Sequence, residues 1–239
     1  MLDVHPPRER THTWKDFFIH IATIVIGLLI AISFEQTVEF FHHRDQRRQL
    51  LEDLPHEAAE RVQILPLNNR FHANAEKWLR DILDAALAAS PVGGAVTFVV
   101  PPEPAPSRSV KPETAAWAAA KASGAVSVLS RSEIETWERV DYLAQLAQKN
   151  AEGSQAAHRA LRATCDHIGA SLKAGSTVHV TLERRDELTR SLGTLIEAVD
   201  ALLVDDVNSM GASNAVLHGA QTWEQMAPFV TEAVNSTPR

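Results

Sequence analysis

The sequence predicts an all-α protein, with one N-terminal transmembrane helix followed by an antiparallel helical bundle. Three observations predict it: an uncharged apolar run near the start, apolar residues at helical spacing along most of the rest, and little of the alternation typical of strands. We divide the 239 residues into a short tail at 1–16, a transmembrane helix with its interface at 17–41, membrane-proximal helices at 42–90, a proline-rich loop at 91–112 and the remaining helices of the bundle at 113–239.

The apolar run at residues 17–34 contains no charged side chain, and Phe, Ile, Val and Leu fill most of it. A helix of this length covers about 27 Å, close to the hydrocarbon thickness of a bilayer. Aromatic residues stand at both ends of the run, as they do at membrane interfaces: Trp14, Phe17 and Phe18 at one end, and Phe34, Phe40 and Phe41 at the other. The run therefore predicts a lipid bilayer as the partner of this segment.

Two other interpretations of the run remain open. A buried core helix can be apolar all round, although such runs are usually shorter. A cleavable signal peptide would use the small residues Ala31 and Ser33, but no polar spacer precedes that site. We therefore favour an uncleaved, single-pass anchor.

The flanking charges give only a slight preference for orientation, because three Lys or Arg residues lie on each side of the run. Lys15 directly abuts the run, whereas Glu35 and Glu39 come first on the far side. We expect the N-terminus inside the cell and the C-terminal domain outside.

Small residues recur along one face of the predicted span. Thr23, Gly27 and Ala31 lie four residues apart, and small residues at this spacing let membrane helices approach closely. They predict a transmembrane association face and a homodimer formed through it.

Composition indicates a folded domain after the anchor, since 45% of the residues are hydrophobic and 22% are charged. The net charge of −7 and the lack of a basic tract make nucleic acid an unexpected partner. The single cysteine, Cys165, excludes an internal disulfide.

Helical spacing continues beyond the predicted span. Apolar residues at 51, 54, 58, 62 and 65 step by three or four, but Pro55 and Pro66 interrupt the pattern. We expect a new helix to start at Asp53 and a true break at Pro66, followed by a second helix that ends near Ser90. Within the proline-rich loop, residues 96–100 predict one short strand that cannot be central.

Four further helices are expected in the C-terminal part. An alanine-rich helix ends at Gly124, and a long helix opens with a capping box, formed by Ser130 with Glu133 or by Ser132 with Glu135, and runs to about Lys173. The residues 174–181 interrupt the helices, and Thr181 caps the next one. A short helix is expected in the tail, around residues 216–229.

The strongest packing pattern outside the membrane lies in the helix after Thr181. Five apolar residues repeat there with spacing 4-3-4-3, typical of a coiled coil or antiparallel bundle: Leu188, Leu192, Leu195, Val199 and Leu202. In the preceding helix, Cys165 falls on a similar apolar stripe, so we interpret it as a buried side chain.

Two stretches resemble a family of bacterial single-pass membrane proteins. The first contains HTWKDFFIH, IGLLIAI, EQTVE and HHR; the second is TAAWAAAKASGAVSVLSRSEIETWERVDYL. The resemblance implies a membrane-anchored helical protein. For a bacterial protein we expect the anchor in the inner membrane and, with the orientation given above, the domain in the periplasm. The resemblance implies no particular activity, and no functional residue can be assigned from it.

No linear motif points to catalysis. His42 and His43 have no His or Cys three or four positions away, so no metal site is predicted. The acidic residues at 183–187 and at 205–206 are interpreted as a solvated helical face. No cofactor and no catalytic residue are expected. We interpret the chain as a membrane-anchored interaction, sensory or scaffold protein with an unknown protein partner; the alternative is a membrane-tethered enzyme whose His or carboxylate site lacks a linear motif.

Overall fold

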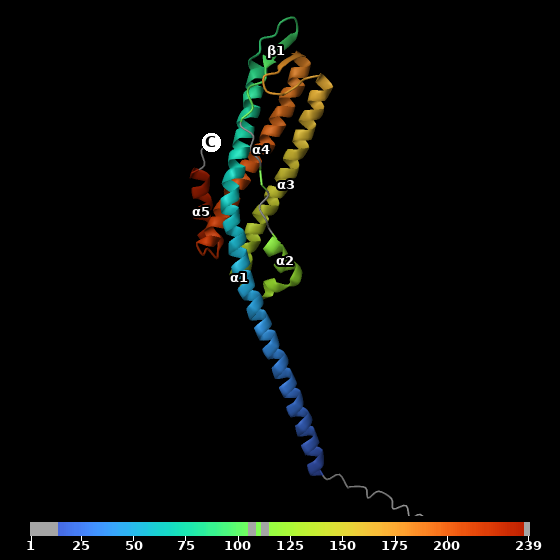
Figure 1. Ribbon diagram of the computed structural model, residues 1–239, viewed down its shortest axis with the longest axis vertical. Helices are drawn as coiled ribbons and strands as arrows, with labels where there is room; N and C mark the ends of the chain where they lie inside the picture. Colours follow the sequence, from blue (N-terminus) through green and yellow to red (C-terminus); the bar gives the residue numbers. More distant parts are fainter. Residues whose placement is uncertain (1–13, 105–108, 111–114, 237–239) are drawn as a thin grey trace, which may run out of the picture. The chain divides into compact units, whose positions relative to one another are not determined.

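The computed structural model describes residues 14–104, 109–110 and 115–236. Most of these residues are helical, which confirms the prediction of a mainly all-α protein. The elements follow one another as α1 (Trp14–Ala88), β1 (Ala95–Val99), α2 (Ala115–Ser123), the 3-10 helix η1 (Ala125–Val128), α3 (Arg131–Ile168), β2 (Thr177–Thr181), α4 (Leu182–Leu217) and α5 (Trp223–Ser236) (Figure 1). The chain divides into two units, which meet in sequence between Gln49 and Leu50.

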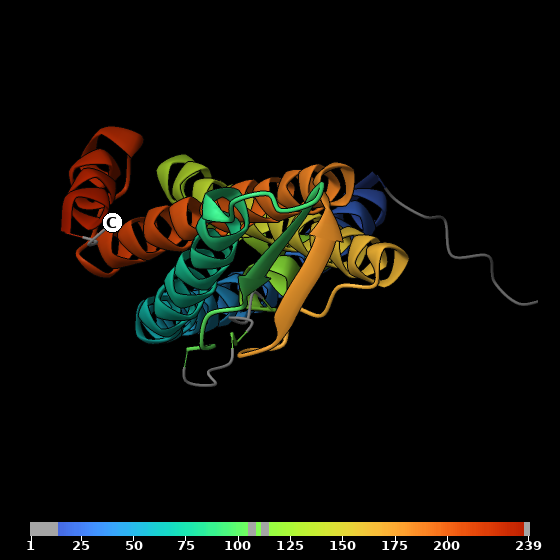
Figure 2. The same cartoon turned by 90° about the horizontal axis from the view of Figure 1, so that it is seen from above.

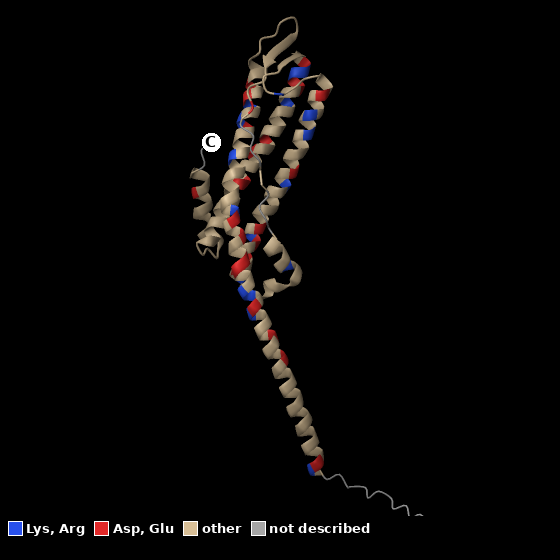
Figure 3. Cartoon of the chain, viewed as in Figure 1, with Lys and Arg blue, Asp and Glu red and all other residues tan. Residues whose placement is uncertain are grey.

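The first unit contributes the N-terminal part of α1. Its apolar stretch is long enough and apolar enough to cross a membrane, and no residue of that stretch is buried. Figure 3 shows this part of the helix without Lys, Arg, Asp or Glu over several turns. A signal sequence near an N-terminus would share these properties, so membrane insertion is taken up below as a proposal.

Helix α1 continues through Pro55 and Pro66, so the predicted start at Asp53 and the predicted break at Pro66 are wrong. A proline inside a helix removes one backbone hydrogen bond and crowds the preceding turn. Here α1 buries side chains on both sides of each proline, among them Leu54, Ala58 and Leu65. Tertiary packing of this face outweighs the local cost.

In the second unit, α4 lies between α3 and the second-unit part of α1. The Thr164 hydroxyl is 3.0 Å from that of Ser191, and Asn150 donates to Asp205 at 2.8 Å. Residue numbers therefore fall along α4 as they rise along α3, so the two helices run in opposite directions. Contacts of α1 with α4 at His72 and Arg80 show that these two helices also run in opposite directions.

The core of the second unit consists of two apolar clusters. The sheet-side cluster joins the end of α1, both strands, the second half of α3 and residues 188–199 of α4. The α2-side cluster joins residues 50–58 of α1 with α2, the start of α3, the end of α4 and α5. All five residues of the 4-3-4-3 pattern on α4 are buried, and so is Cys165.

The two short strands cover one end of this core. Strand β1 pairs antiparallel with β2, with Phe98 opposite Val178, and Figure 2 shows the strands side by side. One face of the pair carries the buried side chains of Val96, Phe98, Val178 and Val180. The short strand near residue 96 was predicted. Strand β2 was not, because only two alternating valines mark it.

Local sequence explains where the helices begin and end. The Ser130 hydroxyl and the Glu133 carboxylate form the capping box at the start of α3, and the Thr181 hydroxyl caps α4, as predicted. Gly124 ends α2 and Gly169 ends α3, both with the positive φ that glycine adopts most easily. Helix α3 thus ends several residues before the predicted Lys173.

Helix α5 packs closely against α4 at Gly211. A Cβ atom at residue 211 would lie 2.6 Å from the Cα of Val230, closer than real Cβ contacts. We expect Gly211→Ala to lower the free energy of unfolding by about 1–3 kcal/mol, because the backbone of α5 has to shift. Denaturant unfolding of the full chain in detergent measures this loss, and amide exchange should rise along α5.

Gly193 provides the matched control on the same helix, because a Cβ atom there meets nothing within 4 Å. Gly193→Ala should stabilise the protein by up to about 1 kcal/mol, the difference in helix propensity. Equal effects of the two substitutions would show that the close approach of α5 is not a constraint.

Candidate functional site

A belt of polar side chains lies between the two apolar clusters and extends into the α2-side cluster. It includes residues at 57–72 of α1, 121 of α2, 141–150 of α3 and 205–209 of α4, and several of its members are buried. Buried polar groups need hydrogen-bond partners, so this belt is where the core has the most demanding chemistry. It contains two groups: an ion-pair group (Glu57, Arg61, Lys121, Asp141) and a His-Asp group (His72, Asn150, Asp205, Asp206).

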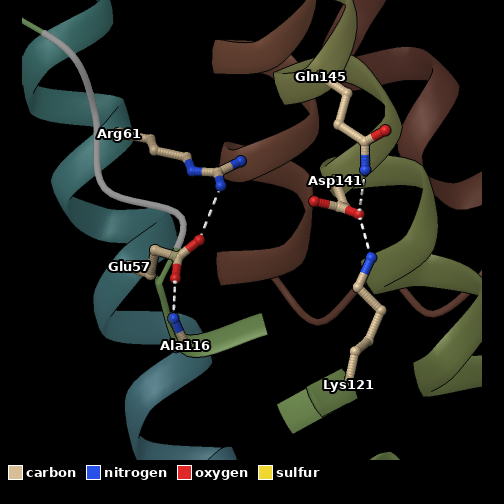
Figure 4. Close-up of polar contacts among 6 residues, drawn as sticks. All are labelled: Glu57, Arg61, Ala116, Lys121, Asp141 and Gln145. Carbon is tan, nitrogen blue, oxygen red and sulfur yellow. Dashed lines mark hydrogen bonds and ion pairs between the residues drawn. The ribbon is translucent and has the colours of Figure 1, made fainter. Parts of the chain in front are cut away.

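In the ion-pair group, Glu57 serves two partners at once (Figure 4). One carboxylate oxygen accepts a hydrogen bond from Arg61 at 2.7 Å, and the other accepts from the backbone N–H of Ala116 at 2.9 Å. The first N–H groups of a helix have no partner inside the helix, so Glu57 anchors the start of α2 to α1. Burial lowers the pKa of Arg61, and Glu57 opposes this effect.

The second ion pair of this group fixes the other end of α2 to α3. The Lys121 ammonium lies 2.5 Å from an oxygen of Asp141, which also accepts a hydrogen bond from Gln145 at 2.8 Å (Figure 4). The hydrogen bond to Asp141 raises the pKa of Lys121. The same ammonium stands 5.9 Å from the ring centre of the buried Trp117, so charge and packing hold α2 in one place.

The His-Asp group connects α4 to both of its neighbours. The Nδ1 atom of His72 on α1 lies 2.7 Å from an oxygen of Asp206, and Asn150 on α3 donates to Asp205 at 2.8 Å. Burial raises the pKa of both carboxyl groups; His72 opposes the rise at Asp206, and the hydrogen bond from Asn150 opposes it at Asp205.

The interpretation of Asp205 and Asp206 as a solvated face is wrong, since only 4% and 6% of them are exposed. Neighbouring residues on a helix point about 100° apart. Because α4 is covered on two sides, one aspartate reaches α3 and the next reaches α1. The acidic stretch at 183–187, in contrast, remains largely exposed or half-buried, as expected.

The belt offers polar chemistry without an evident place for a substrate. A crevice of about 140 Å³ in the second unit lies elsewhere, between α1, the start of α3 and the connection from α4 to α5, and its lining includes Leu54, Thr136, Trp137 and Ala220. Within the described part of the chain, no group of three or more His, Cys, Asp or Glu side chains is placed to hold a metal ion.

The predicted transmembrane association face lies on the exposed part of α1 in the first unit. The Thr23 hydroxyl donates to the carbonyl of Ile19 at 2.8 Å, and a Cβ atom at Gly27 would meet nothing within 4 Å. The single chain therefore places Thr23, Gly27 and Ala31 on one face, and association through them stays a prediction.

Sequence reasoning missed most residues of the belt, although a signal for them exists. Buried residues 54, 58, 61, 65, 68 and 72 follow one another on α1 with the spacing 4-3-4-3-4. Arg61, Asn68 and His72 thus continue an apolar stripe with polar side chains. A polar residue on an apolar stripe is a candidate buried group.

Comparisons of the chain with models of protein families, with curated proteins and with solved structures find no match. The roles of these residues therefore follow from the geometry alone.

The buried pair of Glu57 and Arg61 yields a test. We expect Glu57→Gln to lower the free energy of unfolding by about 3–5 kcal/mol, because it leaves the Arg61 charge buried without a counter-ion. The Gln side chain keeps an oxygen that can accept from the N–H of Ala116, so the loss of stability measures the effect of removing the charge of Glu57. The double substitution Glu57→Gln with Arg61→Met should recover much of it, as measured by denaturant unfolding.

The exposed pair of Lys77 and Asp81 has the same spacing on the same helix and serves as the control. Asp81→Asn should cost less than about 1 kcal/mol. If the double substitution were as unstable as Glu57→Gln alone, an uncompensated charge would not be the cause.

Asp205 yields a prediction about pH. Burial raises its pKa in the folded protein above the ordinary 3.8. Its favourable contribution to the free energy of unfolding is therefore complete below about pH 3.8, and it is lost as pH rises through the pKa of the folded state. Asp205→Asn should therefore stabilise the protein at neutral pH, by on the order of 1 kcal/mol, because it removes a buried charge. The gain should shrink toward pH 3.8. The exposed Glu152, changed to Gln, should show no comparable gain.

Proposed function

We propose that this chain is a membrane-anchored helical interaction or sensory protein. Residues 17–34 cross a bilayer once, and the second unit forms an antiparallel helical bundle that binds a protein partner. The observation that carries the proposal is the apolar stretch of α1, of which no residue is buried in the structure. Uncovered apolar surface of this length is far more stable in lipid than in water.

The ends of the stretch support this placement. Trp14, Phe17 and Phe18 form a group of ring contacts at one end. At the other end the Arg44 guanidinium lies 5.5 Å from the ring centre of Phe41. Aromatic rings and basic side chains are favoured together at the headgroup level. The resemblance to bacterial single-pass proteins extends the proposal to the inner membrane. The position of Lys15 directly against the apolar run favours the periplasm for the second unit.

The arrangement of the polar belt favours binding over catalysis. Its charged groups pair with one another, and the crevice of the second unit is lined by neither His72 nor Asp206. An enzyme remains the second candidate, because a histidine bonded to a carboxylate is the arrangement of many general bases. A general base has to reach a substrate, however, and His72 is buried.

Two copies of the span can also associate in the membrane. Thr23, Gly27 and Ala31 give a face of small residues, and the Thr23 hydroxyl is already satisfied by its own helix. Close backbone packing, rather than a hydrogen bond between spans, would then hold the proposed homodimer.

Fusion of alkaline phosphatase after Arg239 tests the anchor and its orientation. We expect the fusion to be active in a bacterium and to stay with the membrane after carbonate extraction, because a single uncleaved span exports the C-terminal unit. A cytoplasmically active reporter at the same place is the control and should be silent. An inactive phosphatase would reverse the orientation. A mature chain that begins at Phe34 would show a cleaved signal sequence.

A further inference from the structure

One arginine on the surface of the second unit is in contact with two aromatic rings. The Arg139 guanidinium on α3 lies 4.4 Å from the ring centre of Trp223 on α5 and 5.6 Å from that of Tyr142. Both rings remain accessible, with 45% of Trp223 and 54% of Tyr142 exposed. We call these three residues the Arg-aromatic patch.

The charge of Arg139 has no carboxylate partner among the described residues. One acidic residue next to Arg139 in sequence and one next to Trp223 are engaged otherwise. Glu138 acts on Lys121, and Glu224 accepts from its own backbone N–H and from the Thr222 hydroxyl, which lowers its pKa. Arg131, two turns earlier on the same face of α3, does have a partner in Glu135 at 2.7 Å.

The ring contacts leave the donors of Arg139 available to an anion. A guanidinium that lies over aromatic rings keeps its N–H groups for hydrogen bonds in its own plane. A carboxylate binds that edge through two parallel hydrogen bonds. Because the rings already restrict the side chain, less rotational freedom is lost on binding.

The patch also has the composition of a binding hot spot, in which Trp, Tyr and Arg are enriched. The crevice of about 140 Å³ lies between α1, the start of α3 and the connection to α5, and its lining includes Thr136 and Gln221, which are close in sequence to Arg139 and Trp223. Its lining is mainly apolar and includes Leu51 and Trp137. We propose that the Arg-aromatic patch binds an acidic segment of a partner protein, with a carboxylate on Arg139 and a neighbouring apolar side chain at the crevice.

Charge complementarity selects this partner. The patch presents a cation without a carboxylate partner in the described part of the chain, and a carboxylate matches it. Nucleic acid is disfavoured because the patch offers one cation, whereas a phosphate backbone is bound by many. The inference rests on the proposed role as an interaction protein. It does not depend on the orientation of the anchor.

The test uses the full chain in nanodiscs of zwitterionic lipid and a short fluorescein-labelled peptide of repeated Glu-Leu-Glu-Phe. Fluorescence anisotropy should show binding of this peptide and much weaker binding of the same peptide with Gln for Glu. Arg139→Gln should weaken binding of the acidic peptide by about tenfold or more, because a charge-assisted bidentate contact is lost. Arg139→Lys should fall between the two, since it keeps the charge without the planar fork.

Arg131→Gln is the matched control and should leave binding unchanged, with circular dichroism confirming that each variant is folded. Equal binding by the wild type and Arg139→Gln overturns the proposal, and so does the absence of binding by the acidic peptide. Binding of phosphatidylglycerol vesicles that Arg139→Gln abolishes, with no binding of the acidic peptide, would assign the patch to lipid instead. A dimer in light scattering that Arg139→Gln dissociates would assign it to a second copy. Phosphatase activity of the fusion after Arg239 is unaffected by any of these outcomes, so failure of the patch and failure of the anchor are distinguishable.

Discussion

The need to pair each buried charge within the middle of a helical core constrains the second unit more than any other interaction. An apolar seam tolerates sliding of one helix along another, because one leucine can replace the next at little cost. A buried ion does not, because separation from its partner leaves an uncompensated charge in a region of low dielectric. Glu57 and His72 thus fix the position of α1 against α2 and α4, and Asp141 fixes α3 against α2.

The His-Asp group lies where the apolar core divides into two clusters. Each cluster is closed by its own cover: the strand pair covers one, and α2 with α5 covers the other. Apolar burial supplies most of the stability on both sides of the belt. The belt itself contributes little net stability, and its role is to exclude other alignments of the same helices. That role is attested for buried polar residues in some helical proteins, although not in all.

Much of the fold could be predicted because its signals are local. The capping box at Ser130 and the glycine at 124 depend on a few neighbouring residues, and the five apolar residues from Leu188 repeat within one helix. The belt could not be predicted in the same way. Its contacts join residues far apart in sequence, such as His72 and Asp206, and no pattern within either helix predicts which residue of the other helix it contacts.

A stricter use of spacing would nevertheless have found half of the belt. The seam on α4 continues beyond Leu202 with the same steps to Asp206, Ser209 and Ser213, all buried. The apolar repeat ends at Leu202 because the next members are polar, yet their position on the stripe still places them in the interior. Helix continuity through Pro55 and Pro66 has a similar origin: a long buried face outweighs a local breaker, and its strength cannot be judged until the covering helices are known.

The same reasoning separates the charges that hold the fold from those available to a partner. Three charged residues are buried in ion pairs in the interior, and a partner could reach them only by opening the core: Glu57, Arg61 and Asp141. Arg139 differs because its contacts are with ring faces, which a carboxylate does not need. An anion approaching in the plane of the guanidinium leaves the contact with Trp223 in place, so binding and the attachment of α5 to α3 do not compete. A partner that binds there would add a constraint between α3 and α5 without disturbing the ion pairs beneath.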